Sequence, residues 1–260
     1  MSKKFTIFGN PVKHSISPKM HGFAIAGLNL DASYSKTLVE DGSKIKEIFL
    51  KEFDGANVTV PHKEIAYKLC DEVRGVAKQI GAVNTLVKED GKMIGYNTDA
   101  SGFYESIKEF DDIKDVLILG AGGTSKAISL YLKNKGYNIT VLNRSQKRLD
   151  SFSDFDTFCW DDFKPNKYDM IINTTSAGLA DNNYPTPKEI LKSIFKDAKV
   201  AVDVIYNKNT PFLSLAKERG LKTKDGSDML LYQGVKAFNL FYGGKFDEAE
   251  ITTFMRKAFS

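Results

Sequence analysis

Residues 115–127 read DVLILGAGGTSKA, and this stretch decides the fold of the second half of the chain. It begins with an apolar run of strand length, continues with three glycines and ends in a pattern typical of a helix start. This is the context of a dinucleotide-binding motif, because glycines let the backbone approach a pyrophosphate and the helix N-terminus offers free N–H groups. Gly120 and Gly122 fit the usual spacing, Gly123 is additional, and the third glycine of that spacing is missing. A tight turn alone therefore remains an alternative explanation of the glycines.

The segment after the next predicted strand indicates which cofactor is bound. Enzymes that bind NAD usually carry Asp or Glu about 20 residues after the glycines, where it binds the ribose 2′-hydroxyl. In this chain Asn143, Arg144 and Ser145 follow the strand instead, and Arg148 comes shortly after them. A carboxylate would repel a 2′-phosphate, whereas a guanidinium binds one through two hydrogen bonds. These residues predict NADP rather than NAD; the alternative is a solvated basic turn.

Strands and helices alternate along the chain, which indicates parallel sheets with helices on their faces. Ser17 is expected to cap the first helix, and Asp90-Gly91 predicts a hairpin. The predicted strands span residues 5–8, 33–39, 56–60, 84–88, 92–96, 116–119, 138–142, 170–173 and 200–205. The predicted helices span residues 17–28, 43–53, 63–73, 76–80, 100–109, 124–135, 210–220, 227–241 and 248–259.

These elements predict an α/β protein with two domains. We expect residues 1–100 to form an N-terminal α/β substrate domain with a mostly parallel sheet, and residues 101–237 to form a Rossmann-type NADP-binding domain. The C-terminal helices, about 238–260, are expected to pack back on the first domain. No Gly/Ser-rich linker separates the halves, so the boundary rests on the change of motif.

Composition and charge exclude several classes of protein. Interspersed charges with a net value of +4 and no Arg-rich stripe argue against a nucleic-acid partner. No run of about 18 apolar residues is present, and the two N-terminal lysines precede no long apolar segment, so we expect neither a membrane span nor a signal peptide. Two distant cysteines predict reduced thiols in a cytoplasmic protein, and three histidines without metal-ligand spacing predict no metal.

Four polar segments of the first half have no evident structural task. They span residues 10–17, 57–63, 81–85 and 95–99. In open α/β sheets, ligands bind beyond the carboxyl ends of strands, and the amides and hydroxyls of these segments suit a polyhydroxylated acid. Each residue alone also has a plain explanation: Ser17 and Asp99 as helix caps, Asn84 as a turn residue and Lys63 as a solvated helix residue.

Eight short motifs lie in order along nearly the whole chain. In the first half they are GNPxxHSxSPxxH at 9–21, NVTVPxKE at 57–64, GAVNT at 81–85 and NTD at 97–99. In the second half they are GAGG at 120–123, NR at 143–144, NxTSxG at 173–178 and DMLxxQ at 228–233. In this order they resemble the motifs of the shikimate dehydrogenase family. The resemblance implies an NADP-dependent oxidoreductase that interconverts 3-dehydroshikimate and shikimate, on the route to chorismate and aromatic amino acids.

The resemblance also implies roles for particular side chains. Lys63 and Asp99 would form the catalytic pair at the carbonyl that accepts hydride. The implied substrate-binding residues are Ser15, Ser17, Thr59, Lys63, Asn84, Asp99, Tyr206 and Gln233. The cofactor-binding residues that the glycine motif and the resemblance predict are Gly120, Ala121, Gly122, Gly123, Thr124, Asn143, Arg144, Ser145, Arg148, Thr175, Val204, Gly226 and Met229.

Three positions depart from the family's pattern. Tyr96 stands where many members have Asp, Thr174 replaces a common Ala, and Asp225 precedes Gly226 where Asn is frequent. Tyr96 bears on the approach to Asp99, and none of the three removes a proposed catalytic group.

Two alternatives stay open at this point. One is a dehydrogenase of the same fold that takes quinate or both substrates; Arg144 argues against a form that uses NAD. The other is a non-catalytic NADP-binding regulatory relative, which would need neither Lys63 nor Asp99. The sequence leaves open whether the chain forms a homodimer.

Overall fold

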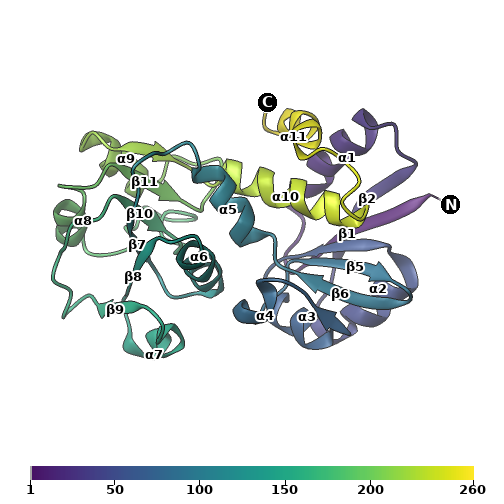
Figure 1. Cartoon of the computed structure of the whole chain (residues 1–260), viewed down its shortest axis with the longest axis horizontal. Helices are drawn as coiled ribbons and strands as arrows, with labels where there is room; N and C mark the ends of the chain where they lie inside the picture. Colours follow the sequence, from purple (N-terminus) through teal and green to yellow (C-terminus); the bar gives the residue numbers. More distant parts are fainter. Residues whose placement is uncertain (1) are drawn as a thin grey trace. The chain divides into compact units, whose positions relative to one another are not determined.

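The computed structural model describes residues 2–260, which form two compact units. Unit 1 comprises Met1–Gly102 and Leu231–Ser260, and unit 2 comprises Phe103–Leu230. The chain crosses between the units within helix α5 (Asp99–Ile107) and again within helix α10 (Ser227–Phe241) (Figure 1). Across the described part of the chain, no helix combines the length and the apolar character that a membrane crossing requires.

Unit 1 is built on a six-stranded sheet in the order β2-β1-β3-β5-β6-β4. All neighbouring strands run parallel except β5, which is antiparallel to both β3 and β6. Asn57 on β3 lies opposite Thr85 on β5, and Thr85 lies opposite Tyr96 on β6. The carboxyl ends of β3 and β6 therefore meet the amino end of β5 at one edge of the sheet. The strands are β1 (Lys3–Gly9), β2 (Ala32–Leu38), β3 (Gly55–Val58), β4 (Glu72–Val73), β5 (Thr85–Glu89) and β6 (Lys92–Tyr96).

Successive side chains of a strand point to opposite faces of the sheet. In unit 1 both faces carry apolar side chains, and helices cover both. Phe5 of β1 packs in a cluster with Met20, Phe238 and Met255, whereas Phe8 of the same strand packs in a second cluster. Helix α11 contacts α1, so the C-terminal helices belong to unit 1, as expected. The other helices of this unit are α1 (Ser17–Gly27), η1 (Gly42–Lys44), α2 (Ile45–Glu52), α3 (Lys63–Leu69), α4 (Ala77–Ile80), α11 (Glu248–Arg256) and η3 (Lys257–Phe259).

Unit 2 has a six-stranded, fully parallel sheet in the order β12-β11-β10-β7-β8-β9. Read from β9, this is the 3-2-1-4-5-6 order of a dinucleotide-binding fold, in which the order reverses between β7 and β10. Two apolar clusters lie on its two faces. The elements are β7 (Asp115–Leu119), α6 (Gly123–Asn134), β8 (Asn138–Asn143), α7 (Gln146–Leu149), η2 (Asp150–Phe152), β9 (Asp156–Cys159), β10 (Met170–Asn173), α8 (Lys188–Ile194), β11 (Val200–Asp203), α9 (Pro211–Glu218) and β12 (Lys222–Lys224).

The predicted α/β class with a Rossmann-type sheet is confirmed, and so is the hairpin. Asp90 and Gly91 both have positive φ values, 49° and 74°, as a tight hairpin turn between β5 and β6 requires. The predicted capping by Ser17 is wrong. Ile16 occupies the N-cap position of α1, no side chain caps the helix, and the hydroxyl of Ser15 instead accepts a hydrogen bond from the Ser17 N–H at 3.3 Å.

The prediction of one helix over residues 63–73 is wrong at its C-terminal end. Helix α3 ends at Leu69, and Glu72–Val73 pairs with β6 as strand β4. The carboxylate of Asp71 explains the break, because it accepts a hydrogen bond from the Met93 N–H at 2.9 Å and pairs with the Lys46 ammonium at 2.5 Å. These contacts with distant residues override the local helical pattern. The short elements α7, α8, β9 and β12 were not predicted either.

Candidate active site

A lysine and an aspartate from separate segments form an ion pair in unit 1. Lys63 is the first residue of α3, and Asp99 is the first residue of α5. The Lys63 Nζ lies 2.6 Å from the Asp99 Oδ2, and the two side chains are 27% and 13% exposed. The pair is therefore partly shielded from water but accessible, which suits groups that stabilise charge or transfer a proton at a bound substrate.

Asn84 holds the second oxygen of the aspartate. Its Nδ2 donates to the Asp99 Oδ1 at 2.8 Å and to the Thr98 Oγ1 at 3.0 Å, and it lies 3.5 Å from the Gln233 Oε1. Its Oδ1 accepts the Thr98 backbone N–H at 2.8 Å. The structure therefore brings together four of the predicted site residues, namely Lys63, Asn84, Asp99 and Gln233.

Ser15, Ser17 and Thr59 follow the carboxyl ends of the neighbouring strands β1 and β3. The segments that carry them are joined by a hydrogen bond from the Asn10 N–H to the Val60 carbonyl at 3.1 Å. Ser17 is buried, whereas Ser15 and Thr59 are partly exposed. All three belong to the same sheet edge as the Lys63–Asp99 pair.

The glycine turn of unit 2 forms one wall of a pocket of about 670 Å³. Gly120 has a φ of +103°, and a Cβ at this position would lie 2.9 Å from the Thr175 Cγ2, so only glycine fits without strain. Gly122 is the N-cap residue of α6 and makes no side-chain cap. The first N–H groups of this helix are therefore available to an anion, as a pyrophosphate site requires.

Basic and amide side chains after β8 line the same pocket. Asn143, Arg144 and Arg148 are lining residues, and both arginines are exposed. The Asn143 Nδ2 donates to the Ser145 carbonyl at 2.9 Å, which holds this turn in shape. The acidic lining residue Asp181 comes from the loop after β10, and its pKa is lowered by backbone N–H donors of that loop. The residues present fit a cofactor that carries a 2′-phosphate.

The segment after β11 is packed against Gly226. A Cβ on Gly226 would lie 2.1 Å from the Val204 carbonyl oxygen, and the Gly226 N–H donates to the Ile205 carbonyl at 3.0 Å. Asp203 is fully buried, and burial raises the pKa of its carboxyl despite hydrogen bonds from Thr210 and Asn173. Asp203 therefore holds the segment after β11 in place through its hydrogen bonds. The predicted substrate residue Tyr206 is 39% exposed.

Not every predicted cofactor residue lines the pocket. Gly120, Ala121, Gly122, Asn143, Arg144, Arg148 and Thr175 do. Met229, on α10, packs against the core of unit 2. The residues outside the lining are Gly123, Thr124, Ser145, Val204, Gly226 and Met229.

Trp160 and Lys188 line the pocket but were not predicted. Trp160 follows the unpredicted strand β9, and Lys188 begins the unpredicted helix α8. Trp160 is the sole tryptophan of the chain, and this rarity was the available signal, because the residues that follow it, Asp161 and Asp162, are acidic. The sequence carries no comparable signal for Lys188.

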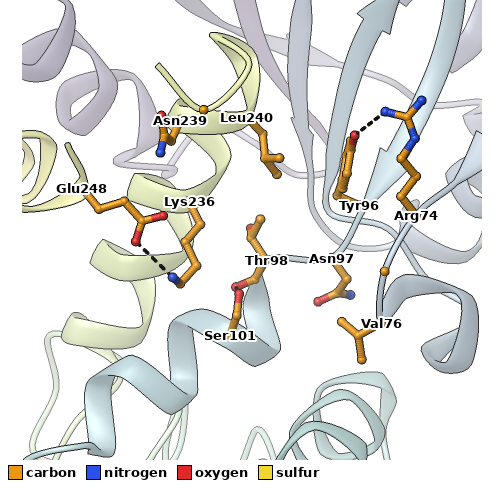
Figure 2. A pocket seen from close by; sticks show the side chains of 12 residues that line it. Arg74, Val76, Tyr96, Asn97, Thr98, Ser101, Lys236, Asn239, Leu240 and Glu248 are labelled. Carbon is orange, nitrogen blue, oxygen red and sulfur yellow. Dashed lines mark hydrogen bonds and ion pairs between the residues drawn. The ribbon is translucent and has the colours of Figure 1, made fainter. Parts of the chain in front are cut away.

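Tyr96 lines a separate pocket of about 260 Å³ in unit 1. Figure 2 shows Tyr96 and Arg74 on one side of it and the Lys236–Glu248 ion pair on the other. The Tyr96 hydroxyl accepts a hydrogen bond from Arg74 at 2.9 Å, and Arg74 also pairs with Glu89 at 2.8 Å. Tyr96, which departs from the family's pattern, is thus hydrogen-bonded to an arginine that is itself held in a salt bridge.

The other two departures have local partners. The Thr174 hydroxyl donates to the Leu119 carbonyl at 2.8 Å, which ties β10 to the end of β7 beside the glycine turn. Asp225 accepts the N–H groups of Asn207 at 2.9 Å and Ser227 at 3.1 Å. Both residues thus stabilise loops that surround predicted cofactor residues.

The described residues contain no group of three or more His, Cys, Asp or Glu side chains that could hold a metal ion. Cys70 and Cys159 are free thiols. Burial raises the pKa of Cys70 to about 12, so its thiol is protonated and unreactive at neutral pH.

Taken together, the parallel sheet of unit 2, its glycine turn with nearby arginines, and the ammonium–carboxylate pair of unit 1 define the class of nicotinamide-dependent oxidoreductases. The comparisons with known proteins identify the family within this class. Residues 7–86 match the family model of the shikimate dehydrogenase substrate-binding domain.

Relatives match over nearly the whole chain. The chain is 45% identical to a shikimate dehydrogenase (NADP(+)) of Helicobacter hepaticus, over 95% of this chain and 94% of the relative. It is 35% identical to shikimate 5-dehydrogenase from Thermus thermophilus, solved in complex with NADP(H) and shikimate, with a TM-score of 0.86 over 99% of this chain and 100% of that chain. A ligand-free 5-ketofructose reductase of a Gluconobacter species is 31% identical, with a TM-score of 0.84 over 99% of each chain. The chain belongs to the shikimate dehydrogenase family.

Proposed function

We infer that the chain is an NADP-dependent dehydrogenase that interconverts 3-dehydroshikimate and shikimate. The observation that carries this inference is the Lys63–Asp99 ion pair, 2.6 Å long and partly shielded, in a chain that is 45% identical to a shikimate dehydrogenase (NADP(+)). A protein that only binds NADP has no use for such a pair.

The charge on the reacting oxygen explains why both groups are needed. When bound, NADPH supplies the hydride that reduces the ketone. Negative charge then builds on the carbonyl oxygen, and the Lys63 ammonium stabilises it. A proton passes to that oxygen from the Lys63–Asp99 pair, and in the reverse direction the pair accepts the alcohol proton.

The remaining substrate contacts come from neutral polar groups. We propose that Ser15 and Ser17 bind the carboxylate, and that Thr59 and Gln233 bind ring hydroxyls. Asn84 donates to the Asp99 Oδ1 at 2.8 Å and so also orients the catalytic carboxylate. Tyr206, in unit 2, is proposed as a further substrate contact.

The pocket of unit 2 is proposed to hold the cofactor. The glycine turn and the N-terminus of α6 would bind the pyrophosphate, since the helix start lacks a side-chain cap. Arg144 and Arg148, with Asn143 and Ser145, would bind the 2′-phosphate. Val204, Gly226 and Met229 would lie near the nicotinamide.

A spectrophotometric assay tests the proposed function. Mixing the protein with NADP and shikimate should increase the NADPH absorbance, and shikimate should be oxidised faster than quinate. NADP should be preferred over NAD. If the protein turns over 5-ketofructose but not 3-dehydroshikimate, the proposed substrate is wrong while the oxidoreductase class stands.

Location and assembly are part of the same proposal. The free thiols of Cys70 and Cys159 support a reducing compartment, and we propose a cytoplasmic location, which cell fractionation would test. Sedimentation of the purified protein would distinguish a monomer from a homodimer.

A further inference from the structure

A continuous series of hydrogen bonds between side chains leads from β2 to the catalytic aspartate. The Tyr34 hydroxyl donates to the Asn57 Oδ1 at 2.7 Å. The Asn57 Nδ2 donates to the Thr85 Oγ1 at 3.3 Å, and the Thr85 hydroxyl donates to the Asn84 Oδ1 at 3.0 Å. The Asn84 Nδ2 ends the series at the Asp99 Oδ1, at 2.8 Å. Three strands of the unit 1 sheet thus connect to one carboxylate.

The direction of each bond follows from backbone groups that have a single role. The Asn57 amide also faces the Asn84 backbone carbonyl, at 3.2 Å, and a carbonyl only accepts. The NH2 of Asn57 must therefore face that carbonyl, and its oxygen faces Tyr34. In the same way the Thr98 backbone N–H only donates, so the Asn84 oxygen accepts it at 2.8 Å and the Asn84 NH2 faces Asp99. Every bond in the series thus donates toward the carboxylate.

The middle of the series is closed to water. Asn57, Asn84 and Thr85 are 5%, 2% and 0% exposed. A buried donor or acceptor that loses its partner cannot be satisfied by solvent, so each member of such a series depends on the next.

The first member of the series is fixed by aromatic stacking. The Tyr34 ring stacks on the His21 ring, with centroids 4.2 Å apart and planes inclined by 14°. Burial raises the pKa of Tyr34 well above its ordinary value, so the hydroxyl keeps its proton and remains a donor.

We propose that Tyr34 and Asn57 are positioning residues for the reaction: they fix the amide of Asn84, which in turn holds Asp99 in the orientation that meets Lys63. The effect on turnover rests on the proposed function, whereas the coupling between Tyr34 and Asn84 does not. A rotation of the Asp99 carboxylate would break its contacts to Lys63 and Asn84 together, which is why the support behind Asn84 matters.

Tyr34→Phe tests the proposal because it deletes one oxygen and keeps the stacked ring. We expect kcat for shikimate oxidation to fall about threefold to tenfold, the scale of one hydrogen bond, with a smaller change in KM. The matched control is Tyr242→Phe. Its hydroxyl is also buried in unit 1 but has no hydrogen-bond partner among residues 2–260, so kcat should stay at the parent value.

A second measurement needs no turnover. The side-chain amide protons of Asn84, observed by NMR, report the hydrogen bond to Asp99. In Tyr34→Phe they should move toward the position of a free amide and exchange faster with solvent, and in Tyr242→Phe they should not. Unchanged Asn84 signals in Tyr34→Phe would overturn the proposal, whatever the activity.

Asn57→Ala and the double variant complete the test. If the series acts as a unit, adding Tyr34→Phe to Asn57→Ala should lower kcat little further, whereas independent effects on kcat would multiply. If the effects of the two substitutions on kcat multiply, Tyr34 does not act through Asn57 and the proposal is wrong. If Tyr34→Phe lowers thermal stability but leaves kcat unchanged, the role of Tyr34 is purely structural. A parent protein that does not oxidise shikimate would refute the proposed function, and the Asn84 signals would still decide whether Tyr34 and Asn84 are coupled.

Discussion

The polar site of unit 1 and the pocket of unit 2 are constructed in opposite ways. In unit 1 the proposed catalytic side chains are held by other side chains: Lys63 by Asp99, and Asp99 by Asn84. In unit 2 the pocket is made of a glycine turn, an uncapped helix start and exposed arginines such as Arg144. The first arrangement orients a group for reaction, and the second presents donors to a charged ligand from solvent.

This difference predicts where each kind of substitution acts. Changes in the unit 1 network should lower kcat, because they disturb the groups that we propose to act at the transition state. Changes in the unit 2 pocket should alter the KM or Kd of the cofactor, because they remove binding contacts. A unit 1 substitution that changes only the KM or Kd of the cofactor, or a unit 2 substitution that lowers only kcat, would contradict this difference between the two regions.

Lys63→Ala should have the largest effect. The missing ammonium leaves the developing oxyanion without its charged partner, so kcat should fall about a hundredfold or more, with a smaller change in KM. Steady-state kinetics with shikimate and NADP measure both constants. Lys68→Ala is the matched control, because Lys68 lies on the same helix and is exposed. Turnover at the parent level in Lys63→Ala would remove this lysine from the mechanism.

Substitutions at Gly120 and Gly122, in the same turn, should act on different quantities: the first on stability and the second on cofactor binding. Gly120→Ala should lower the free energy of unfolding by about 1–3 kcal/mol, because alanine is strained at a φ of +103° and its Cβ would approach Thr175. A Cβ on Gly122 would meet nothing within 4 Å apart from its own chain neighbours, and Gly122 lines the pocket, so Gly122→Ala should change the unfolding free energy less than Gly120→Ala while the Kd of NADPH rises. Thermal unfolding and cofactor titration measure the two quantities. Equal stability losses in both variants would contradict this division.

Local patterns predicted the framework of both regions, but not the support behind the reacting groups. The apolar run 116–119 and the glycines after it gave the dinucleotide fold, because strand, turn and helix are adjacent in sequence. Lys63 and Asp99 were identified from a resemblance between motifs. The link from Tyr34 to Asn57 joins two strands through single side chains, and neither residue type in a strand indicates such a bond.

The buried histidine of unit 1 predicts a pH dependence of stability. Burial lowers the pKa of His21 to about 3, and neither ring nitrogen has a hydrogen-bond partner within residues 2–260. The unfolded chain binds this proton near its ordinary pKa of 6.5, so between about pH 6.5 and 3 the unfolded state holds more protons than the folded state. The contribution to stability is therefore present above pH 6.5 and is lost as the pH falls, by up to about 1.4 kcal/mol per pH unit.

His21→Phe should remove this dependence while keeping an aromatic ring against Tyr34. Urea unfolding between pH 4 and 7 measures the slope in the parent and the variant. At pH 7 the variant should be at least as stable, since a buried ring nitrogen without a partner is unfavourable. The same slope in both proteins would show that other groups cause the acid sensitivity.

Arg144→Ala should act on cofactor binding alone, and by a smaller factor than Lys63→Ala acts on turnover. Loss of a charge-assisted contact to the 2′-phosphate should raise the KM of NADPH about tenfold, while the KM of NADH, which lacks that phosphate, changes little. The kcat at saturating NADPH should stay near the parent value, in contrast to Lys63→Ala. Lys147→Ala is the control, because Lys147 is an exposed cation three residues further on, on α7, and lies outside the pocket lining. If both cofactors weaken equally, Arg144 contacts a part that they share, and the preference for NADP must come from Arg148 or from residues outside this turn.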